Sequence, residues 1–366
     1  MRWLRYASTL MAVHIGIGLF TGQVRPGSDR TFTQEYRETV DLVRLAETVG
    51  FDSAWVSEHH GAGDGYLPSL LPMLAAFAEA TEHIRLGTGV MLTPFHDPLR
   101  LAEDAAAVDL LSGGRLILGL GLGWREEEFR MFGVPIHERL ARTTETVEIL
   151  RRAWTGERFS FEGSVYSYDR VQVRPAPERS ASEAGAGGGG SVPIVLGGNV
   201  DAAIRRAGRI GDGWIRSRPA DLPTVKRDLA TMESGAREAG RDPSKLSFVQ
   251  LRSAFVWDEG GDIAWNVVRD GLAHANGVYD GWDAGGDTPD TGFVLPELDE
   301  AAARASTPVG TPREVAHALR PFAEAFGGRG DFTLVVRLHY PGMDYDTASH
   351  AVELFGEHVI PALKGA

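Results

Sequence analysis

The chain contains no cysteine among its 366 residues. This absence excludes disulfides, thiolate nucleophiles and zinc sites built on thiolates. It is typical of proteins in a reducing compartment, and we expect a cytoplasmic protein. The sequence also lacks an uninterrupted apolar run of the roughly 20 residues that a membrane helix needs. Association with a membrane is therefore not expected.

Basic residues are outnumbered in this chain. Lys and Arg total 37 against 50 Asp and Glu, so the formal net charge is −13. No long basic block offsets this charge, and an acidic chain has no overall attraction for nucleic acid or anionic membranes. With 43% hydrophobic residues, the chain can nevertheless bury a sizeable core. The composition favours a soluble globular protein whose partner is a small molecule.

Nucleotide-binding fingerprints are missing as well. The chain has no Walker-type lysine loop and no GxGxxG motif with a downstream acid. The stretch GLGLG at 119–123 does not qualify, because Trp124 stands where the last glycine would be needed. We therefore expect neither a nucleotide hydrolase nor a Rossmann-type dinucleotide site.

The segment 84–133 shows how the chain is organised. Residues 84–90 form an apolar, glycine-interrupted strand pattern, residues 99–111 are good helix formers, and residues 115–120 are apolar again. A strand, a helix and a second strand of these lengths predict a right-handed parallel βαβ unit. Parallel strands are covered on both faces, which explains the continuous apolar runs.

The same alternation recurs along the whole chain. Eight strand patterns are each followed by a helix pattern, which predicts a (β/α)₈ TIM barrel with insertions. A doubly wound open sheet is the alternative. We expect one domain over 13–366, preceded by an N-terminal extension at 1–12. The predicted strands are 13–20, 51–57, 84–90, 115–120, 193–196, 212–215, 246–257 and 332–338.

Three stretches interrupt the alternation. Residues 159–173 alternate apolar and polar side chains and predict a β-hairpin that turns at Gly163-Ser164. Residues 178–191 are of low complexity and predict a mobile surface loop. Residues 258–307 are rich in Gly, Asp and Trp and predict an irregular, lid-like insertion. The aromatic residues Tyr279, Trp282 and Phe293 of this insertion are candidate lid and substrate contacts.

The active site of a (β/α)₈ barrel lies at the carboxyl ends of its strands. The second predicted strand ends in Glu58-His59-His60. An imidazole that points into the mouth can donate or accept a proton near neutral pH, so His59 is the candidate general acid–base. His60 is a candidate substrate contact, although a histidine satisfied by core hydrogen bonds remains an alternative for both. Neighbouring histidines at a strand end point in opposite directions, and we expect no metal site here.

The fifth predicted strand leads into Gly197-Gly198-Asn199, directly before a helix. Free backbone N–H groups and the positive end of the helix favour an anion at such a turn, typically a phosphate. Phosphate sites gather in the second half of eightfold barrels, which strengthens this interpretation. A tight turn without a ligand is the alternative.

Three segments of the chain resemble the bacterial luciferase-like monooxygenase superfamily of flavin- and deazaflavin-dependent (β/α)₈ oxidoreductases. They are FDSAWVSEHHGAGDGYLPS, the segment 84–133 (IRLGTGVMLTPFHDPLRLAEDAAAVDLLSGGRLILGLGLGWREEEFRMFG) and VPIVLGGNVDAAIRRAGRIGDGWI. The similarity extends from about residue 13 to residue 363 and is weakest at 176–192 and 258–306.

The resemblance implies a flavin site. His59 matches a histidine beside the reacting edge of the flavin. The bond between Gly89 and Val90 matches a non-prolyl cis peptide that backs the isoalloxazine ring in many members. Trp124 and Trp214 fall at positions that border the cofactor pocket.

The resemblance also places the phosphate of the cofactor at Gly197, Gly198 and Asn199. The luciferase subunits have a phosphate-binding arginine where this chain has Leu122, so the phosphate must be held differently here. The sugar-phosphate dehydrogenases of the superfamily carry an acid in place of Trp124, which disfavours a sugar phosphate as substrate.

Two cofactors are compatible with the resemblance. With reduced FMN and O₂, a flavin C4a-peroxide would oxygenate a small organic, apolar or planar substrate, and a separate NAD(P)H-dependent flavin reductase would supply the reduced FMN. With coenzyme F-420, the reaction would be hydride transfer, with His59 as acid or base. The segment from Glu58 to Ser69 inclines us toward FMN. A non-catalytic flavin-binding barrel is the alternative from another class, and a homodimer is a family-level expectation.

Overall fold

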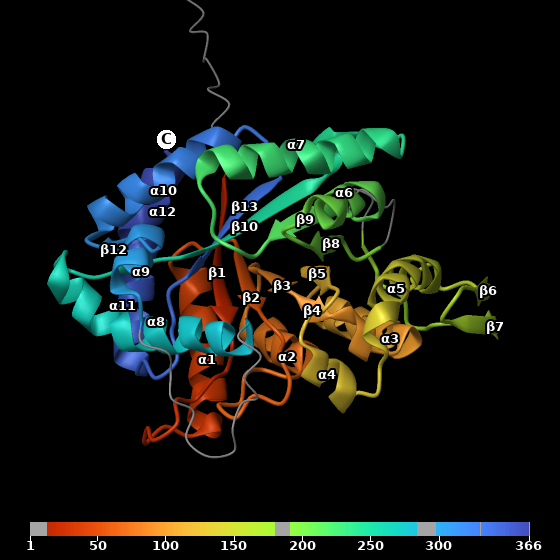
Figure 1. Ribbon diagram of the computed structural model, residues 1–366, viewed down its shortest axis with the longest axis horizontal. Helices are drawn as coiled ribbons and strands as arrows, with labels where there is room; N and C mark the ends of the chain where they lie inside the picture. The colour runs from red at the N-terminus through yellow and green to blue at the C-terminus, as the bar shows by residue number, and fades with distance from the viewer. Residues whose placement is uncertain (1–12, 180–190, 284–297, 330, 366) are drawn as a thin grey trace, which may run out of the picture.

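Eight parallel strands close into a barrel in the computed structural model, which describes residues 13–179, 191–283, 298–329 and 331–365 (Figure 1). Each strand pairs with the next, and the last strand, β13, pairs with the first, β1. The (β/α)₈ barrel is confirmed, and the open sheet is excluded. In barrel order the strands are β1 (His14–Phe20), β2 (Ser53–Val56), β3 (Arg85–Thr88), β5 (Leu116–Gly121), β8 (Ile194–Gly197), β9 (Gly213–Arg216), β10 (Ser247–Ser253) and β13 (Phe332–Arg337).

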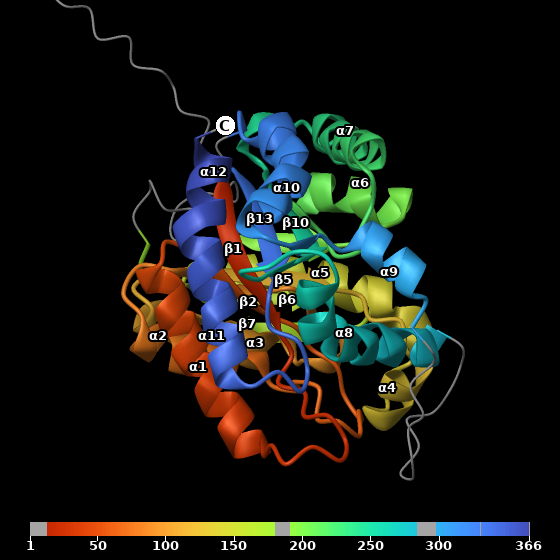
Figure 2. The same ribbon diagram turned by 90° about the vertical axis from the view of Figure 1, so that its left-hand side faces the viewer.

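Helices surround the barrel, and α1, α11 and α12 run beside β1 in the second view (Figure 2). Thr31 and Gln34 form a capping box at the start of α1, which satisfies free N–H groups of its first turn. The helices between and after the barrel strands are α1 (Phe32–Thr48), α2 (Leu70–Ala80), α3 (Pro98–Leu111), α4 (Glu126–Met131), α5 (Arg139–Ala153), α6 (Asp201–Ile210), α7 (Leu222–Glu238), α10 (Pro312–Phe326), α11 (Tyr345–Leu354) and α12 (Ile360–Lys364).

Shorter elements complete the architecture. The predicted hairpin is present as an antiparallel pair that projects from the barrel (Figure 1). The 3₁₀ turns are η1 (Thr93–Phe95), η2 (Ile136–Glu138) and η3 (Pro243–Lys245), and η4 (Phe355–Val359) is a π turn. The remaining strands are β4 (Met91–Leu92), β6 (Phe159–Glu162), β7 (Ser167–Val171), β11 (Phe255–Val256) and β12 (Val309–Gly310).

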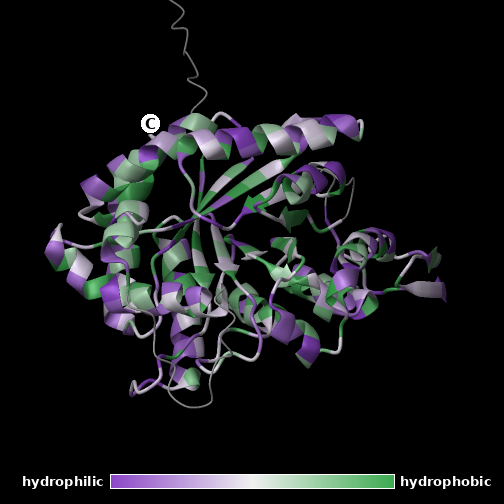
Figure 3. Cartoon of the chain, viewed as in Figure 1, coloured by the Kyte–Doolittle hydropathy of each residue, from purple (hydrophilic) through white to green (hydrophobic). Residues whose placement is uncertain are grey.

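The core has two parts, because successive side chains of a strand point to opposite faces. One face of the strands packs against the helices in a large apolar cluster that includes Trp214 and Phe248. The other face fills the barrel with a smaller cluster around Trp55, Ile215 and Val335. Hydrophilic residues gather on the outward faces of the helices (Figure 3). This division decides which strand residues can face a ligand at the barrel mouth.

The prediction of irregular structure over 258–307 is wrong for the part that the structure describes. Residues 262–283 form a long helix, α8 (Asp262–Asp283), and α9 (Glu300–Ser306) follows it. The apolar residues Trp265, Val268, Leu272, Ala275 and Val278 recur at three- and four-residue spacing and are buried. Gly271 lies within this face, where a Cβ atom would come within 2.8 Å of Cβ of Tyr340. The glycine therefore serves close packing rather than a break in the helix.

Several expectations lie outside the described residues. These are the N-terminal extension at 1–12, most of the low-complexity loop at 178–191, and Phe293. Within the described part of the chain, no helix is both long enough and apolar enough to cross a membrane.

Candidate active site

His59 lies in the loop that follows β2, and its side chain is buried. Its Nδ1 atom is 2.9 Å from Oε1 of Glu128, a buried carboxylate on α4. In the tautomer that donates from Nδ1 to the carboxylate, Nε2 is the nitrogen left for a reacting group. The other oxygen of Glu128, Oε2, is buried without a hydrogen-bond partner among the described residues. The pair has the arrangement of an oriented acid–base group.

Arg125 and the backbone hold Glu128 in place. Oε1 of Glu128 accepts the backbone N–H of His60 at 2.9 Å and lies 3.5 Å from Nη1 of Arg125. The same Nη1 atom donates to the backbone oxygen of His60 at 3.1 Å. The guanidinium of Arg125 lies 4.0 Å from the ring centroid of Trp282. Several contacts therefore fix the carboxylate that orients His59.

Four aromatic rings surround His59 and form what we call the aromatic cage. Their centroids lie 4.6 Å (Trp282), 4.9 Å (Tyr66), 5.5 Å (Tyr279) and 6.5 Å (Trp124) from the imidazole centroid. Trp282 and Tyr279 come from α8, so two of the predicted lid residues are brought against His59. Trp124 is 36% exposed at the edge of the cage. Burial raises the pKa of both Tyr66 and Tyr279, so both phenols are protonated at neutral pH.

His60 turns away from the cage and joins a second acid–histidine group. Its Nε2 atom lies 2.6 Å from Oε1 of Glu58, which also contacts Nε2 of His96 at 2.9 Å. Burial alone would raise the pKa of Glu58, but the hydrogen bonds from both histidines lower it to about 2. The ring of His60 packs against Phe132 at 4.6 Å. The structure thus gives His60 a buried partner of its own.

The peptide between Gly89 and Val90 is cis, as the sequence predicts, and a second non-prolyl cis peptide joins Gly18 to Leu19. The side chain of Val90 faces two glycines on neighbouring strands. A Cβ atom would lie 2.5 Å from Val90 on Gly121 and 3.0 Å from it on Gly197. These glycines leave room for the side chain of Val90, which packs over their backbone, and an apolar surface of this kind fits the flat face of a flavin.

The turn at Gly197-Gly198-Asn199 leads into α6, whose N-cap residue makes no side-chain capping bond. Nδ2 of Asn199 donates to Oγ of Ser217 at 3.1 Å, which ties the turn to the end of β9. The indole of Trp214 donates to the backbone oxygen of Gly198 at 2.8 Å from the helix side of the sheet. Strand alternation turns Ile215 into the barrel and Trp214 outward. Trp214 therefore supports the turn from behind and does not border a pocket inside the barrel.

Two arginines lie close together near this turn. Arg139, at the start of α5, donates from Nη1 to the backbone oxygen of Gly123 at 3.1 Å. Burial and then the charge of Arg139 lower the pKa of Arg206 on α6. Neither arginine forms an ion pair with a carboxylate in the described part of the chain. Two cations whose charges act on one another favour an added anion nearby. Such an anion could be a phosphate, which in this chain would be held without an arginine at position 122.

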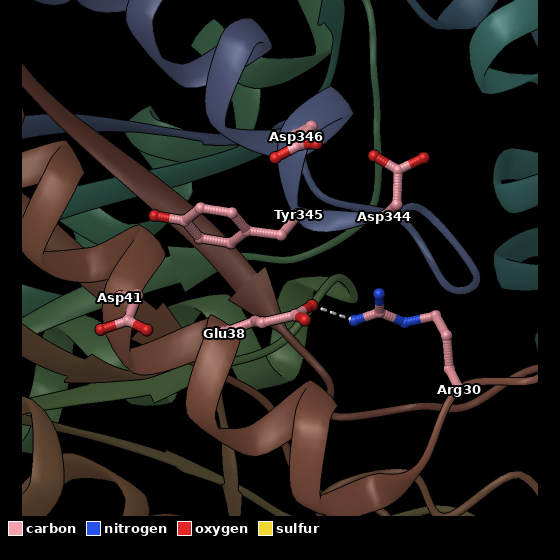
Figure 4. Close-up of a pocket in the computed structure, with 6 residues that line it drawn as sticks. All are labelled: Arg30, Glu38, Asp41, Asp344, Tyr345 and Asp346. Atoms are coloured by element: carbon pink, nitrogen blue, oxygen red, sulfur yellow. Dashed lines mark hydrogen bonds and ion pairs between the residues drawn. The ribbon is translucent and has the colours of Figure 1, made fainter.

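A separate cavity of about 410 Å³ lies between the starts of α1 and α11 (Figure 4). Arg30 makes an ion pair with Glu38 there and a hydrogen bond of 3.0 Å with Glu35. None of the predicted site residues lines this cavity. Its lining comprises Arg30, Glu38, Asp41, Asp344, Tyr345 and Asp346.

The family model for luciferase-like monooxygenases matches residues 14–329. The chain belongs to this family. Its relatives carry the names of oxidoreductases and monooxygenases.

Three members of the family illustrate the range of its relatives. The chain is 36% identical over 233 residues to an F420-dependent glucose-6-phosphate dehydrogenase of Nocardia farcinica, a match that covers 61% of this chain and 66% of that enzyme, slightly under two thirds of its length. It is 28% identical over 368 residues to 4-hydroxyprotoasukamycin monooxygenase of Streptomyces nodosus subsp. asukaensis, covering 96% and 93% of the two chains. The monooxygenase RslO1 from Streptomyces bottropensis superposes with a TM-score of 0.79 at 27% identity, covering 95% of this chain and 99% of that one.

Sequence reasoning missed several residues of the site. Two of them are the carboxylates Glu58 and Glu128, which are both buried beside the histidines at the barrel mouth. Glu128 ends a run of three glutamates, and nothing in the run distinguishes it from Glu126, which is exposed. Only the packing of α4 against the loop after β2 selects Glu128.

Proposed function

We propose that this protein is a flavin-dependent monooxygenase that uses reduced FMN and O₂ to oxygenate a small planar or apolar substrate. The observation that carries the proposal is the His59–Glu128 pair within the aromatic cage. Bound FMN would supply the oxygen chemistry, and the protein would supply binding, orientation and proton control.

The chain's own residues have distinct parts in this reaction. Glu128 holds Nδ1 of His59, so that Nε2 can give or take the proton that the reaction moves. The aromatic cage excludes water from that proton and offers ring surfaces on which a planar substrate can stack. Arg125 contacts both Glu128 and Trp282 and so fixes the position of one side chain relative to the other.

The two ends of the cofactor would be held on opposite sides of the mouth. The ring would lie against Val90, whose side chain packs over Gly121 and Gly197. The phosphate would lie at the uncapped start of α6, where Arg139 and Arg206 supply positive charge. In this arrangement the phosphate is bound without the arginine that the luciferase subunits have where this chain has Leu122.

Hydride transfer with coenzyme F-420 is the second candidate. It is favoured by the similarity to the F420-dependent dehydrogenases, which reaches 36% identity over part of the chain. The same His59 would then act as the acid or base beside the transferred hydride. Another of these dehydrogenases is 30% identical over 90% of the chain, so coverage does not separate the two candidates. We place FMN first because one monooxygenase matches 96% of this chain and another, RslO1, superposes on 95% of it with a TM-score of 0.79.

Anaerobic titrations with FMN and with coenzyme F-420 separate the two candidates. We expect FMN to bind more tightly, and reduced FMN to react rapidly with O₂ in the presence of the protein. His59→Gln should lower turnover by about 10²-fold while FMN affinity stays within a few fold. His96→Gln is the matched control, because His96 contacts Glu58 and not Glu128. Binding of F-420 alone, or full activity of His59→Gln, would reject the proposal.

A separate NAD(P)H-dependent reductase is the partner that this function requires, since the chain has no dinucleotide fingerprint. We expect chemically reduced FMN to support oxygenation without NADH. The protein alone, mixed with FMN and NADH, should consume no NADH. Rapid NADH oxidation by the purified chain would show that no separate reductase is needed.

A further inference from the structure

Arg337 is the last residue of β13 and stands at the barrel mouth. Val335, two residues earlier, belongs to the cluster inside the barrel, so strand alternation directs Arg337 to the same side. Its Nη2 atom donates to Oγ1 of Thr21, the residue that follows β1, at 3.1 Å. Its Nε atom donates to the backbone oxygen of His339 at 3.2 Å. Both hydrogen bonds go to neutral oxygens, and the guanidinium also lies 5.2 Å from the ring centroid of Tyr340.

Arg337 forms no ion pair within 4.0 Å with a carboxylate of the described residues, although its charge acts on the more distant Glu35. Its neighbour His339 stays neutral, because burial and the charge of Arg337 lower the pKa of that imidazole to about 3. The carboxylate of Glu35, which lies 3.8 Å from His339, is already hydrogen-bonded to Arg30 at 3.0 Å. A guanidinium in this position retains its attraction for an added anion.

The field of Arg337 reaches the aromatic cage. Burial raises the pKa of the phenols of Tyr66 and Tyr279, and the positive charge of Arg337 acts to lower it. The rings of these two tyrosines lie 4.9 and 5.5 Å from that of His59. The backbone of Leu67, next to Tyr66, donates to the backbone oxygen of Thr21, the residue whose side chain binds Arg337, so Arg337 and His59 belong to the same end of the barrel.

We propose that Arg337 anchors an acidic oxygen of the substrate, so that the monooxygenase acts on a planar compound that carries a carboxylate or an ionised phenol. A guanidinium presents paired donors that match a carboxylate, and it also binds a single anionic oxygen. The aromatic cage accepts the ring of such a compound. This inference rests on the proposed function, because it assigns the substrate of that site.

Benzoate and benzamide are the probes, because they share a ring and a shape and differ in charge. Equilibrium dialysis against the protein, with and without FMN, measures their binding. We expect benzoate to bind about tenfold tighter or more than benzamide. Arg337→Met should abolish this preference, and Arg337→Lys should retain part of it. 4-Nitrophenolate at alkaline pH then distinguishes a site for phenolates from one for carboxylates only.

Two further variants make the test specific. Arg252→Met is the matched control from the adjacent strand, since the guanidinium of Arg252 lies 4.0 Å from the ring centroid of Phe322 on α10, outside the barrel. This variant should keep the preference for benzoate. Thr21→Val removes a hydrogen bond that positions Arg337 without changing any charge. It should weaken the binding of benzoate and leave the binding of benzamide unchanged. Thermal unfolding checks that each variant is folded.

Equal binding of benzoate and benzamide, absence of binding by both, or an unchanged preference in folded Arg337→Met would overturn the assignment. If Arg337→Met does not fold, the Thr21→Val result decides in its place. Failure of the proposed function looks different: the protein would not take up FMN, while the preference for benzoate and its loss in Arg337→Met would persist.

Discussion

The hydroxyl oxygens of Tyr66 and Tyr279 lie 2.9 Å apart, although 213 residues separate them in the chain. The contact joins the loop after β2 to α8, and a buried pair, Asp64 and His274, joins the same two segments at 2.8 Å. Both tyrosine rings also pack against His59. The imidazole of His59 is therefore enclosed by α8, which these side-chain contacts hold in place.

Shortening Trp282 should open the cage without disturbing the binding of FMN. Trp282→Ala removes the ring nearest to His59, so water reaches the reacting centre and peroxide release uncoupled from substrate oxidation should rise severalfold. Peroxide assays alongside FMN titration measure the two effects. Ile263→Ala, at an exposed position on the same helix, is the control. Unchanged coupling in Trp282→Ala would show that α8 is not a lid.

Glu128 should act on catalysis through His59. Glu128→Gln keeps the size of the side chain but removes the charge that orients and stabilises the imidazole, so we expect kcat to fall by about tenfold or more while KM changes little. Steady-state kinetics with reduced FMN measures both constants. Glu126→Gln changes an exposed carboxylate of the same helix and should behave as the parent. A change confined to KM would contradict a positioning role for Glu128.

Arg206 should contribute to affinity only when the cofactor carries a phosphate. Arg206→Met removes a charge at the start of the phosphate site, and we expect FMN affinity to fall by about tenfold. Riboflavin, which lacks the phosphate, should bind the parent and the variant equally. Fluorescence titration gives both constants, with the exposed Arg209→Met as control. A parallel loss of riboflavin affinity would indicate a folding defect rather than a lost phosphate contact.

Glu58 should make stability depend on pH in the acid range. Its pKa is lowered from 4.5 to about 2 in the folded protein, so its contribution is present above pH 4.5 and is lost as the pH falls toward 2. A shift of this size corresponds to on the order of 3 kcal/mol. Urea unfolding between pH 3 and 7 should show a difference between parent and Glu58→Gln that shrinks on acidification. Glu82→Gln changes an exposed carboxylate and should be as stable as the parent at every pH. A stability difference between the parent and Glu58→Gln that does not vary with pH would refute the assignment.

Much of the architecture could be predicted from local patterns. Helix α2 is one example, because Pro68 and Pro72 mark its start and a continuous apolar run gives its length. The strands were found for a similar reason, since buried parallel strands are short apolar runs between Gly and Pro punctuation. Helix α8 was missed because Gly271 and several aspartates interrupt a face that is apolar only at helical spacing.

Local patterns were enough to predict the eight strand–helix units and to select His59 and the turn at 197–199 as candidate site residues, because these features depend on neighbours within a few residues. The cis peptide at Gly89–Val90 was expected only from the resemblance to luciferase-like enzymes. The closed barrel was needed to show that Glu128 orients His59, that Trp214 faces the helices, and that Arg337 faces the mouth. When both faces of a strand are buried, the pattern does not tell inside from outside, and the partner of a side chain depends on which distant segments the closed barrel brings together.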